Sequence, residues 1–142
     1  LGLLFLAWSW GWISLGQVIL ITAGSTLGIY DFRHQEYPLL VWLTFHLILM
    51  ACSGWNLVMV FFLALGIMAH FIDIRMGAGD FLFLASCALI FSATELLILI
   101  QFASATGILA FLLQKKKERL PFVPFLLLAA TIIIFYQFLL VC

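Results

Sequence analysis

The chain has 142 residues, of which 67% are hydrophobic and 8% are charged, and its formal net charge is zero. A soluble fold of this length needs far more polar surface than six basic and six acidic side chains supply. The hydrophobicity also excludes a disordered chain, and the zero net charge leaves no basic footprint for nucleic acid. The composition therefore predicts an integral membrane protein.

Apolar segments separated by short polar clusters follow one another along the chain. Their continuous hydrophobicity favours helices, because a backbone in hydrocarbon must satisfy its own hydrogen bonds and a β-barrel strand would alternate. The expected helices are 8–30, 39–53, 56–74, 81–94, 96–113 and 122–141. We therefore expect an all-α fold, a single domain over residues 1–142 that forms a bundle of about six transmembrane helices.

Every basic residue of the chain follows the first, third or fifth expected helix. These residues are Arg33, Arg75, Lys115, Lys116, Lys117 and Arg119. In an up-and-down bundle the three loops share one face, and the opposite connections carry no Lys or Arg. The positive-inside rule makes the basic face cytoplasmic and directs both termini outward.

Three aspartates, Asp31, Asp73 and Asp80, all fall on the predicted cytoplasmic side. Ionisable groups at membrane depth are costly, so each is a functional candidate. Asp80 ends the run Gly77-Ala78-Gly79-Asp80, whose two glycines leave the backbone open to close approach where a helix starts.

Asp31 ends the first expected helix and follows a helix-packing pattern. Gly24 and Gly28 form a G-x-x-x-G, and Asp31 lies three residues after Gly28, on the same helix face. Asp31 should therefore point toward a closely packed neighbour. If it meets Asp80 there, the two carboxyls cannot both ionise cheaply, so one keeps a proton while the other accepts one from water. That is the requirement for aspartic proteolysis.

The pattern Asp31-x-Arg33-His34-x-x-x-Pro38, followed by Gly77-Ala78-Gly79-Asp80, resembles the type IV prepilin peptidases. These are membrane aspartic proteases of the G-x-G-D type. Residues 118–125 also resemble the last cytoplasmic loop of that family, which leads into the final helix.

The resemblance implies an endopeptidase of the bacterial inner (plasma) membrane, and leaves open whether it serves a type IV pilus, secretion or DNA uptake. Its substrate would be a prepilin or pseudopilin, cut after a glycine at the junction of a short basic leader and an apolar helix. Asp31 and Asp80 would be the catalytic pair, and Gly77 and Gly79 would let the substrate backbone lie beside Asp80. Asp73 is expected to support the site. No metal or organic cofactor is implied, and the oligomeric state is left open.

The chain departs from the family pattern in two respects. Many members carry a lysine two residues after the second aspartate, where this chain has Leu82, and Arg75 is the candidate substitute. Nothing in the chain matches the N-terminal cytoplasmic region that the family links to N-methylation with S-adenosylmethionine. Either the region belongs to the protein outside this stretch of sequence or this is a peptidase-only form, and we assign methylation to no residue.

Other protease chemistries are not indicated, because the chain holds neither H-E-x-x-H nor G-x-S-x-G. The alternative from another class is a small cation- or proton-coupled transporter that uses the same aspartates. A structural subunit, in which Asp31 and Asp80 only cap helices or pair with Arg33 and Arg75, is the third reading.

Overall fold

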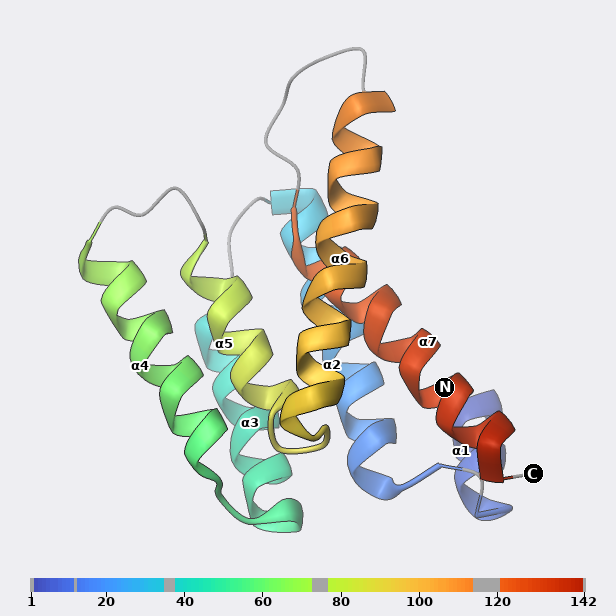
Figure 1. Ribbon diagram of the computed structural model, residues 1–142. Coiled ribbons are helices and arrows are strands. Elements are labelled where there is room, and N and C mark those ends of the chain that lie inside the picture. Colours follow the sequence, from blue (N-terminus) through green and yellow to red (C-terminus); the bar gives the residue numbers. More distant parts are fainter. Residues whose placement is uncertain (1, 12, 35–37, 73–76, 114–120, 142) are drawn as a thin grey trace.

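The fold is helical throughout the part of the chain that the computed structural model describes, residues 2–11, 13–34, 38–72, 77–113 and 121–141. The helices are α1 (Gly2–Ser9), α2 (Leu15–His34), α3 (Leu39–Ser53), α4 (Leu57–Phe71), α5 (Ala78–Cys87), α6 (Ala93–Leu113) and α7 (Val123–Val141). From α2 onward, consecutive helices run in opposite directions through one bundle (Figure 1). The predicted all-α class is confirmed.

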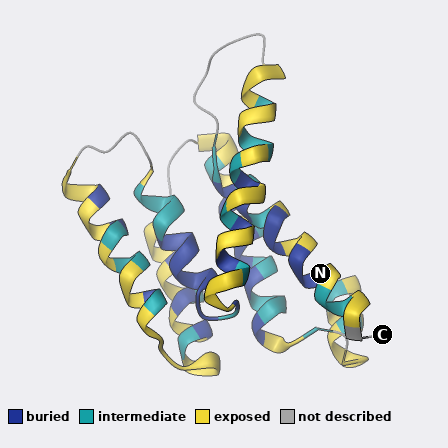
Figure 2. Ribbon diagram, viewed as in Figure 1, coloured by how far each residue is buried: buried dark blue, intermediate teal, exposed yellow. Residues whose placement is uncertain are grey.

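Three helices are long and apolar enough to cross a membrane. They are α2 with 20 residues, α6 with 21 and an 18-residue stretch of α7, and α3, α4 and α5 are shorter apolar helices. The outer faces of the bundle are exposed (Figure 2) and carry large hydrophobic side chains, of which Leu57 and Phe71 are each 82% exposed. Soluble proteins rarely expose apolar surface on this scale. The structure therefore supports a membrane protein with transmembrane helices.

The first expected helix, 8–30, is interrupted. The chain forms α1, leaves helical geometry after Ser9 and starts α2 at Leu15. A capping box marks the new start: the Ser14 backbone N–H donates to Gln17 Oε1 at 2.8 Å, and the Gln17 N–H donates to Ser14 Oγ at 3.3 Å. At its other end α2 continues to His34, beyond Asp31.

The fourth expected helix, 81–94, is also placed differently. Helix α5 begins three residues earlier, inside the Gly-Ala-Gly-Asp run, and ends at Cys87. The chain then turns, and a second capping box starts α6, in which the Ser92 N–H and hydroxyl donate to Glu95 Oε2 at 2.8 and 2.9 Å. Helix α5 is therefore only ten residues long.

Helix α5 is the centre of the bundle. It contacts α2, α3, α4 and α7, and its residues from Leu82 to Cys87 are all buried. Leu20 and Leu27 of α2 and Leu126 of α7 are fully buried around it, and Figure 2 shows buried residues concentrated along α5 and the faces turned toward it. The body of the helix that carries Asp80 is thus enclosed by four other helices.

Candidate active site

Two of the predicted site residues, Asp31 and Asp80, lie at the same end of the bundle. Asp31 is in the last turn of α2 and Asp80 is in the first turn of α5, and both helix termini point to the upper end in Figure 1. We call this the aspartate end. Both residues are partly buried, and the helices that carry them, α2 and α5, are in contact. When both are ionised they repel each other.

The packing of α2 directs Asp31 toward the interior. Asp31 follows the buried residues Gly24 and Leu27 by seven and four positions, so all three share one face. A Cβ atom added to Gly24 would lie 2.5 Å from Leu127 Cδ1 of α7 and 3.0 Å from Phe83 Cζ of α5. Helix α2 thus approaches α5 and α7 closely because residue 24 has no side chain, which confirms the close packing predicted for Gly24. At Gly28 the nearest atom to an added Cβ is Pro124 Cγ at 3.8 Å, which is an ordinary contact.

Asp80 is held by the start of its own helix. Gly77 is the N-cap residue of α5, and its backbone N–H donates to the Asp80 carboxyl. In return the Asp80 N–H donates to the Gly77 carbonyl oxygen at 3.1 Å. An acidic side chain at the third helical position that reaches back to the N-cap is half of a capping box. Asp80 therefore stabilises the helix start and is itself oriented by it.

The remaining predicted site residues divide into two groups. Gly77 is exposed and Gly79 is partly buried, and both flank Ala78 at the start of α5, next to Asp80. Asp73 and Arg75, expected to support the site, lie outside the described residues.

The position that departs from the family pattern points away from the aspartates. Leu82 is 7% exposed, and its Cδ2 lies 2.9 Å from where a Cβ on Gly66 of α4 would be. Two residues along a helix is a rotation of about 200°, so residue 82 faces α4 while Asp80 faces α2. A lysine at this position would enter the α4–α5 contact.

A buried polar cluster joins α3 to α5 below the aspartate end. The Trp42 Nε1–H donates to the Leu82 carbonyl oxygen at 2.9 Å and to Ser86 Oγ at 3.0 Å, and His46 Nδ1 lies 2.9 Å from the same Ser86 Oγ. The Trp42 and His46 rings are stacked with centroids 4.8 Å apart. Sequence reasoning did not single out Trp42 or Ser86, although the spacing from Trp42 to His46 places both on one face of an apolar helix.

A second polar cluster ties helices together at the opposite end of the bundle. Gln17 Nε2 donates to Gln137 Oε1 at 3.2 Å, and Gln137 Nε2 donates to Glu95 Oε1. Gln17 and Glu95 are the two residues that close the capping boxes of α2 and α6. We call these three residues the opposite-end cluster, and its carboxylate is fully engaged in structural hydrogen bonds.

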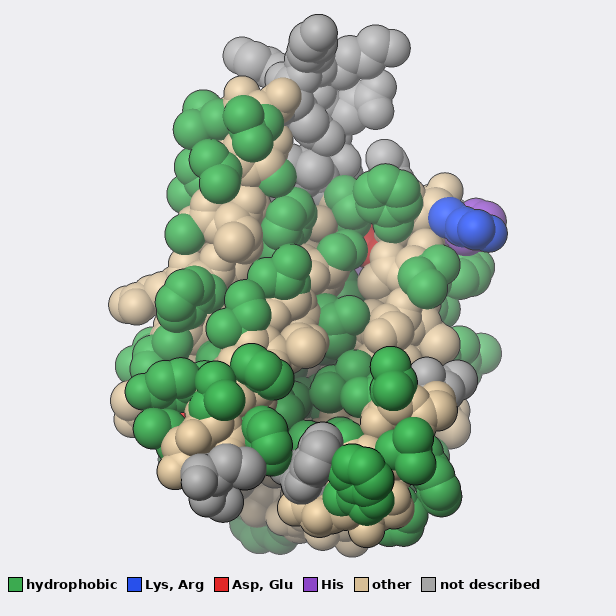
Figure 3. All heavy atoms as spheres, turned by 90° about the vertical axis from the view of Figure 1, so that its right-hand side faces the viewer, with side chains coloured by type: hydrophobic (Ala, Val, Ile, Leu, Met, Phe, Trp, Pro, Cys, Tyr) green, Lys and Arg blue, Asp and Glu red, His purple; other side chains and the backbone are tan. Residues whose placement is uncertain are grey.

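The chemistry available at the aspartate end is therefore that of two neighbouring carboxyls. Figure 3 shows an acidic side chain in a recess between hydrophobic side chains, toward that end of the molecule. Among the described residues, no group of three or more His, Cys, Asp or Glu side chains could hold a metal ion. Two carboxyls that share one proton supply an acid and a base at the same place.

Comparisons with protein-family models, with curated protein sequences and with solved structures gave no match for this chain.

Proposed function

We propose that the protein is a membrane-embedded aspartic endopeptidase with Asp31 and Asp80 as its catalytic pair. The observation that carries the proposal is the placement of two partly buried carboxyls, 49 residues apart in the sequence, at the same end of the contacting helices α2 and α5. Ionisable side chains in an apolar bundle are rare and concentrate at functional sites. A purely capping role explains Asp80, but it leaves the inward-facing Asp31 without a function.

The pair performs hydrolysis by sharing one proton. The ionised carboxylate takes a proton from water as the water oxygen attacks the scissile carbonyl carbon, and the protonated carboxyl donates its proton to the carbonyl oxygen. Collapse of the tetrahedral intermediate breaks the C–N bond, and the leaving nitrogen receives the proton that was taken from water. One hydroxyl of the intermediate returns its proton to the other carboxylate as the product carboxyl forms, which restores the pair with its one shared proton. The apparent pKa values of such a pair belong to both groups together, so the roles are not assigned to individual residues.

The proposed substrate is a prepilin or pseudopilin, cut after a glycine between its basic leader and its apolar helix. The apolar helix would lie in the bilayer while the scissile bond reaches the aspartate end. The exposed Gly77 and the absence of a side chain at Gly79 leave room for an extended backbone beside Asp80.

The proposed topology has about six membrane-spanning helices and places the aspartate end at the cytoplasmic interface of a bacterial inner membrane. Its support is the positive-inside rule together with the direction of the helices. The C-terminal ends of α2, α4 and α6 point to the aspartate end in Figure 1, and these are the helices that precede the basic stretches of the sequence.

The test is cleavage of a prepilin-like peptide by the purified protein in detergent micelles. Asp31→Asn and Asp80→Asn preserve shape but prevent proton sharing, so each should lower the cleavage rate by about 10²–10⁴-fold. The double variant should be no slower than either single variant, because the pair acts as a unit. Glu95→Gln, which changes a carboxyl in the opposite-end cluster, is the matched control and should cleave normally.

Normal cleavage by both aspartate variants would refute the assignment. If the wild-type protein cuts no prepilin-like substrate but takes up protons in proteoliposomes in a manner that depends on Asp31 and Asp80, the protein is a transporter instead.

A further inference from the structure

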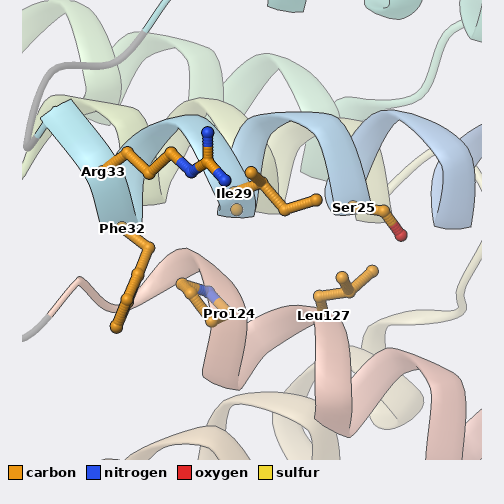
Figure 4. Close-up of a pocket in the computed structure, with 7 residues that line it drawn as sticks. Ser25, Ile29, Phe32, Arg33, Pro124 and Leu127 are labelled. Atoms are coloured by element: carbon orange, nitrogen blue, oxygen red, sulfur yellow. The ribbon is translucent and has the colours of Figure 1, made fainter.

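A groove of about 400 Å³ opens between α2 and α7, near the aspartate end. Its walls are Ser25, Gly28, Ile29 and Phe32 of α2 and Pro124 and Leu127 of α7, and Arg33 lies at its end. Phe32 points toward Pro124 and Leu127 points toward α2 (Figure 4). Pockets that bind small molecules begin at about 300 Å³, so this volume suffices for part of a ligand.

The walls of the groove are apolar. The only hydroxyl among them, on Ser25, already donates to the Ile21 carbonyl oxygen at 2.7 Å. Ile29 is 59% exposed and Phe32 is 72% exposed, so the groove opens on the outer surface of the bundle. An occupant must therefore present a hydrocarbon surface to these side chains.

The end of the groove is cationic. Arg33 is exposed, and its side chain runs along α2 toward Ile29 (Figure 4). Among the described residues no carboxylate pairs with it. A guanidinium is always charged and its planar donors match the geometry of a phosphate. An occupant with an anionic group next to its hydrocarbon part complements both features.

Most of the groove lies on a different face of α2 from Asp31, and Gly28, which also lines the groove, lies between the two faces. Asp31 shares the buried face of Gly24 and Leu27, whereas Ser25, Ile29 and Phe32 repeat at positions i, i+4 and i+7 and form another face. At about 100° per residue, the two faces are about 120° apart.

We infer that the α2–α7 groove binds one anionic membrane phospholipid. An acyl chain lies along Ile29 and Leu127, and the phosphate is bound by Arg33. The lipid fills the space between the helix that carries Asp31 and the last helix of the bundle. This inference is independent of the peptidase proposal, because the site is defined by binding alone.

The test is photo-crosslinking of the whole protein in nanodiscs that contain phosphatidylglycerol or phosphatidylcholine with a diazirine in one acyl chain. Mass spectrometry locates the labelled residues. A basic side chain near the surface favours an anionic lipid by about 1 kcal/mol, which corresponds to about fivefold. We expect phosphatidylglycerol to label residues 25–33 and 124–127 about fivefold more than phosphatidylcholine does.

Variants separate the charge from the shape of the groove. Arg33→Gln should remove the preference for phosphatidylglycerol, and Arg33→Lys should retain most of it. Ser25→Leu fills the groove and should abolish labelling of its walls by either lipid. Thr26→Leu is the matched control, because Thr26 is exposed and lies next to Ser25 but outside the groove, and its labelling should equal that of the wild type.

Equal labelling by the two lipids in the wild type, or a preference that survives Arg33→Gln, would overturn the inference. It is also overturned if a prepilin-like apolar helix displaces the lipid label in proportion to its concentration, because the groove then binds the substrate helix. Arg33→Gln changes an exposed side chain, so the test does not depend on whether Ser25→Leu folds.

Discussion

The two glycines of the G-x-x-x-G pattern should respond differently to the same substitution. In Gly24→Ala the new methyl would lie 2.5 Å from Leu127 Cδ1 and 3.0 Å from Phe83 Cζ. The tip of Leu127 can rotate into the neighbouring groove, but Phe83 is 1% exposed and enclosed by the core. In Gly28→Ala the nearest atom is Pro124 Cγ at 3.8 Å, which is an ordinary contact.

The magnitudes follow from these distances. Overpacking a core costs about 1–3 kcal/mol, and replacing a helical glycine by alanine gains about 1 kcal/mol. Gly24→Ala should therefore lower the free energy of unfolding by about 0–2 kcal/mol, whereas Gly28→Ala should raise it by about 1 kcal/mol. The free energies of unfolding of the two variants should differ by about 1–3 kcal/mol, with Gly28→Ala the more stable. The G-x-x-x-G pattern alone does not predict which glycine tolerates alanine.

The assay is equilibrium unfolding in mixed micelles with increasing sodium dodecyl sulfate, followed by the fluorescence of the tryptophans. Combining Gly24→Ala with Phe83→Leu should recover part of the loss, with a coupling energy of about 0.5–3 kcal/mol. The reasoning is refuted if Gly28→Ala is the less stable of the two variants, or if the Phe83 substitution and Gly24→Ala are simply additive.

Three further predictions test the packing of the bundle. Leu82→Lys should lower the melting temperature in micelles without raising the cleavage rate, because the charge is buried against α4 rather than placed beside Asp80. Leu82→Met is the control. Faster cleavage by the lysine variant would contradict the conclusion that residue 82 faces α4. His46→Phe keeps the ring stacking and loses one hydrogen bond, to Ser86 Oγ, while it also removes an Nε2 atom that is buried without a partner among the described residues. It should therefore be less destabilising than Trp42→Phe, which removes two hydrogen bonds; thermal melting ranks the two. Gln137→Leu should lower the free energy of unfolding by about 0.6–1.7 kcal/mol. It should also speed amide hydrogen exchange in the first turns of α2 and α6, while exchange in the first turn of α5 should stay unchanged.

Local sequence patterns predicted those features that depend on neighbouring residues. The spacing of Gly24, Gly28 and Asp31 on one helix face depends only on helical periodicity, and the structure shows the expected close packing at Gly24. The two capping boxes could have been recognised in the same way, because Ser14-x-x-Gln17 and Ser92-x-x-Glu95 both have the required spacing. Reading them would have moved the start of α2 to Leu15.

Hydropathy could not predict where one apolar helix stops and the next begins. The residues between α5 and α6, from Ala88 to Phe91, are as hydrophobic as the helices they connect. Their turn depends on tertiary contacts, of which the hydrogen bond of 2.6 Å from Asn56 Nδ2 to the Ala88 carbonyl oxygen is one. The same holds for the partners of Trp42, because Ser86 is 44 residues away and only the packing of α3 on α5 brings the two together.

The shortness of α5 has a consequence for how the bundle responds to its bilayer. Ten residues span about 15 Å, or roughly half of a hydrocarbon layer of about 30 Å, whereas α2 and α6 span about 30 Å. Helix α5 is enclosed by α2, α3, α4 and α7. The difference between its length and the hydrocarbon thickness is therefore accommodated by these helices rather than by lipid. Thicker or thinner membranes should therefore tilt the peripheral helices and leave the Asp80 helix in place. The stability of the bundle would then vary with acyl-chain length while the geometry at the start of α5 would not.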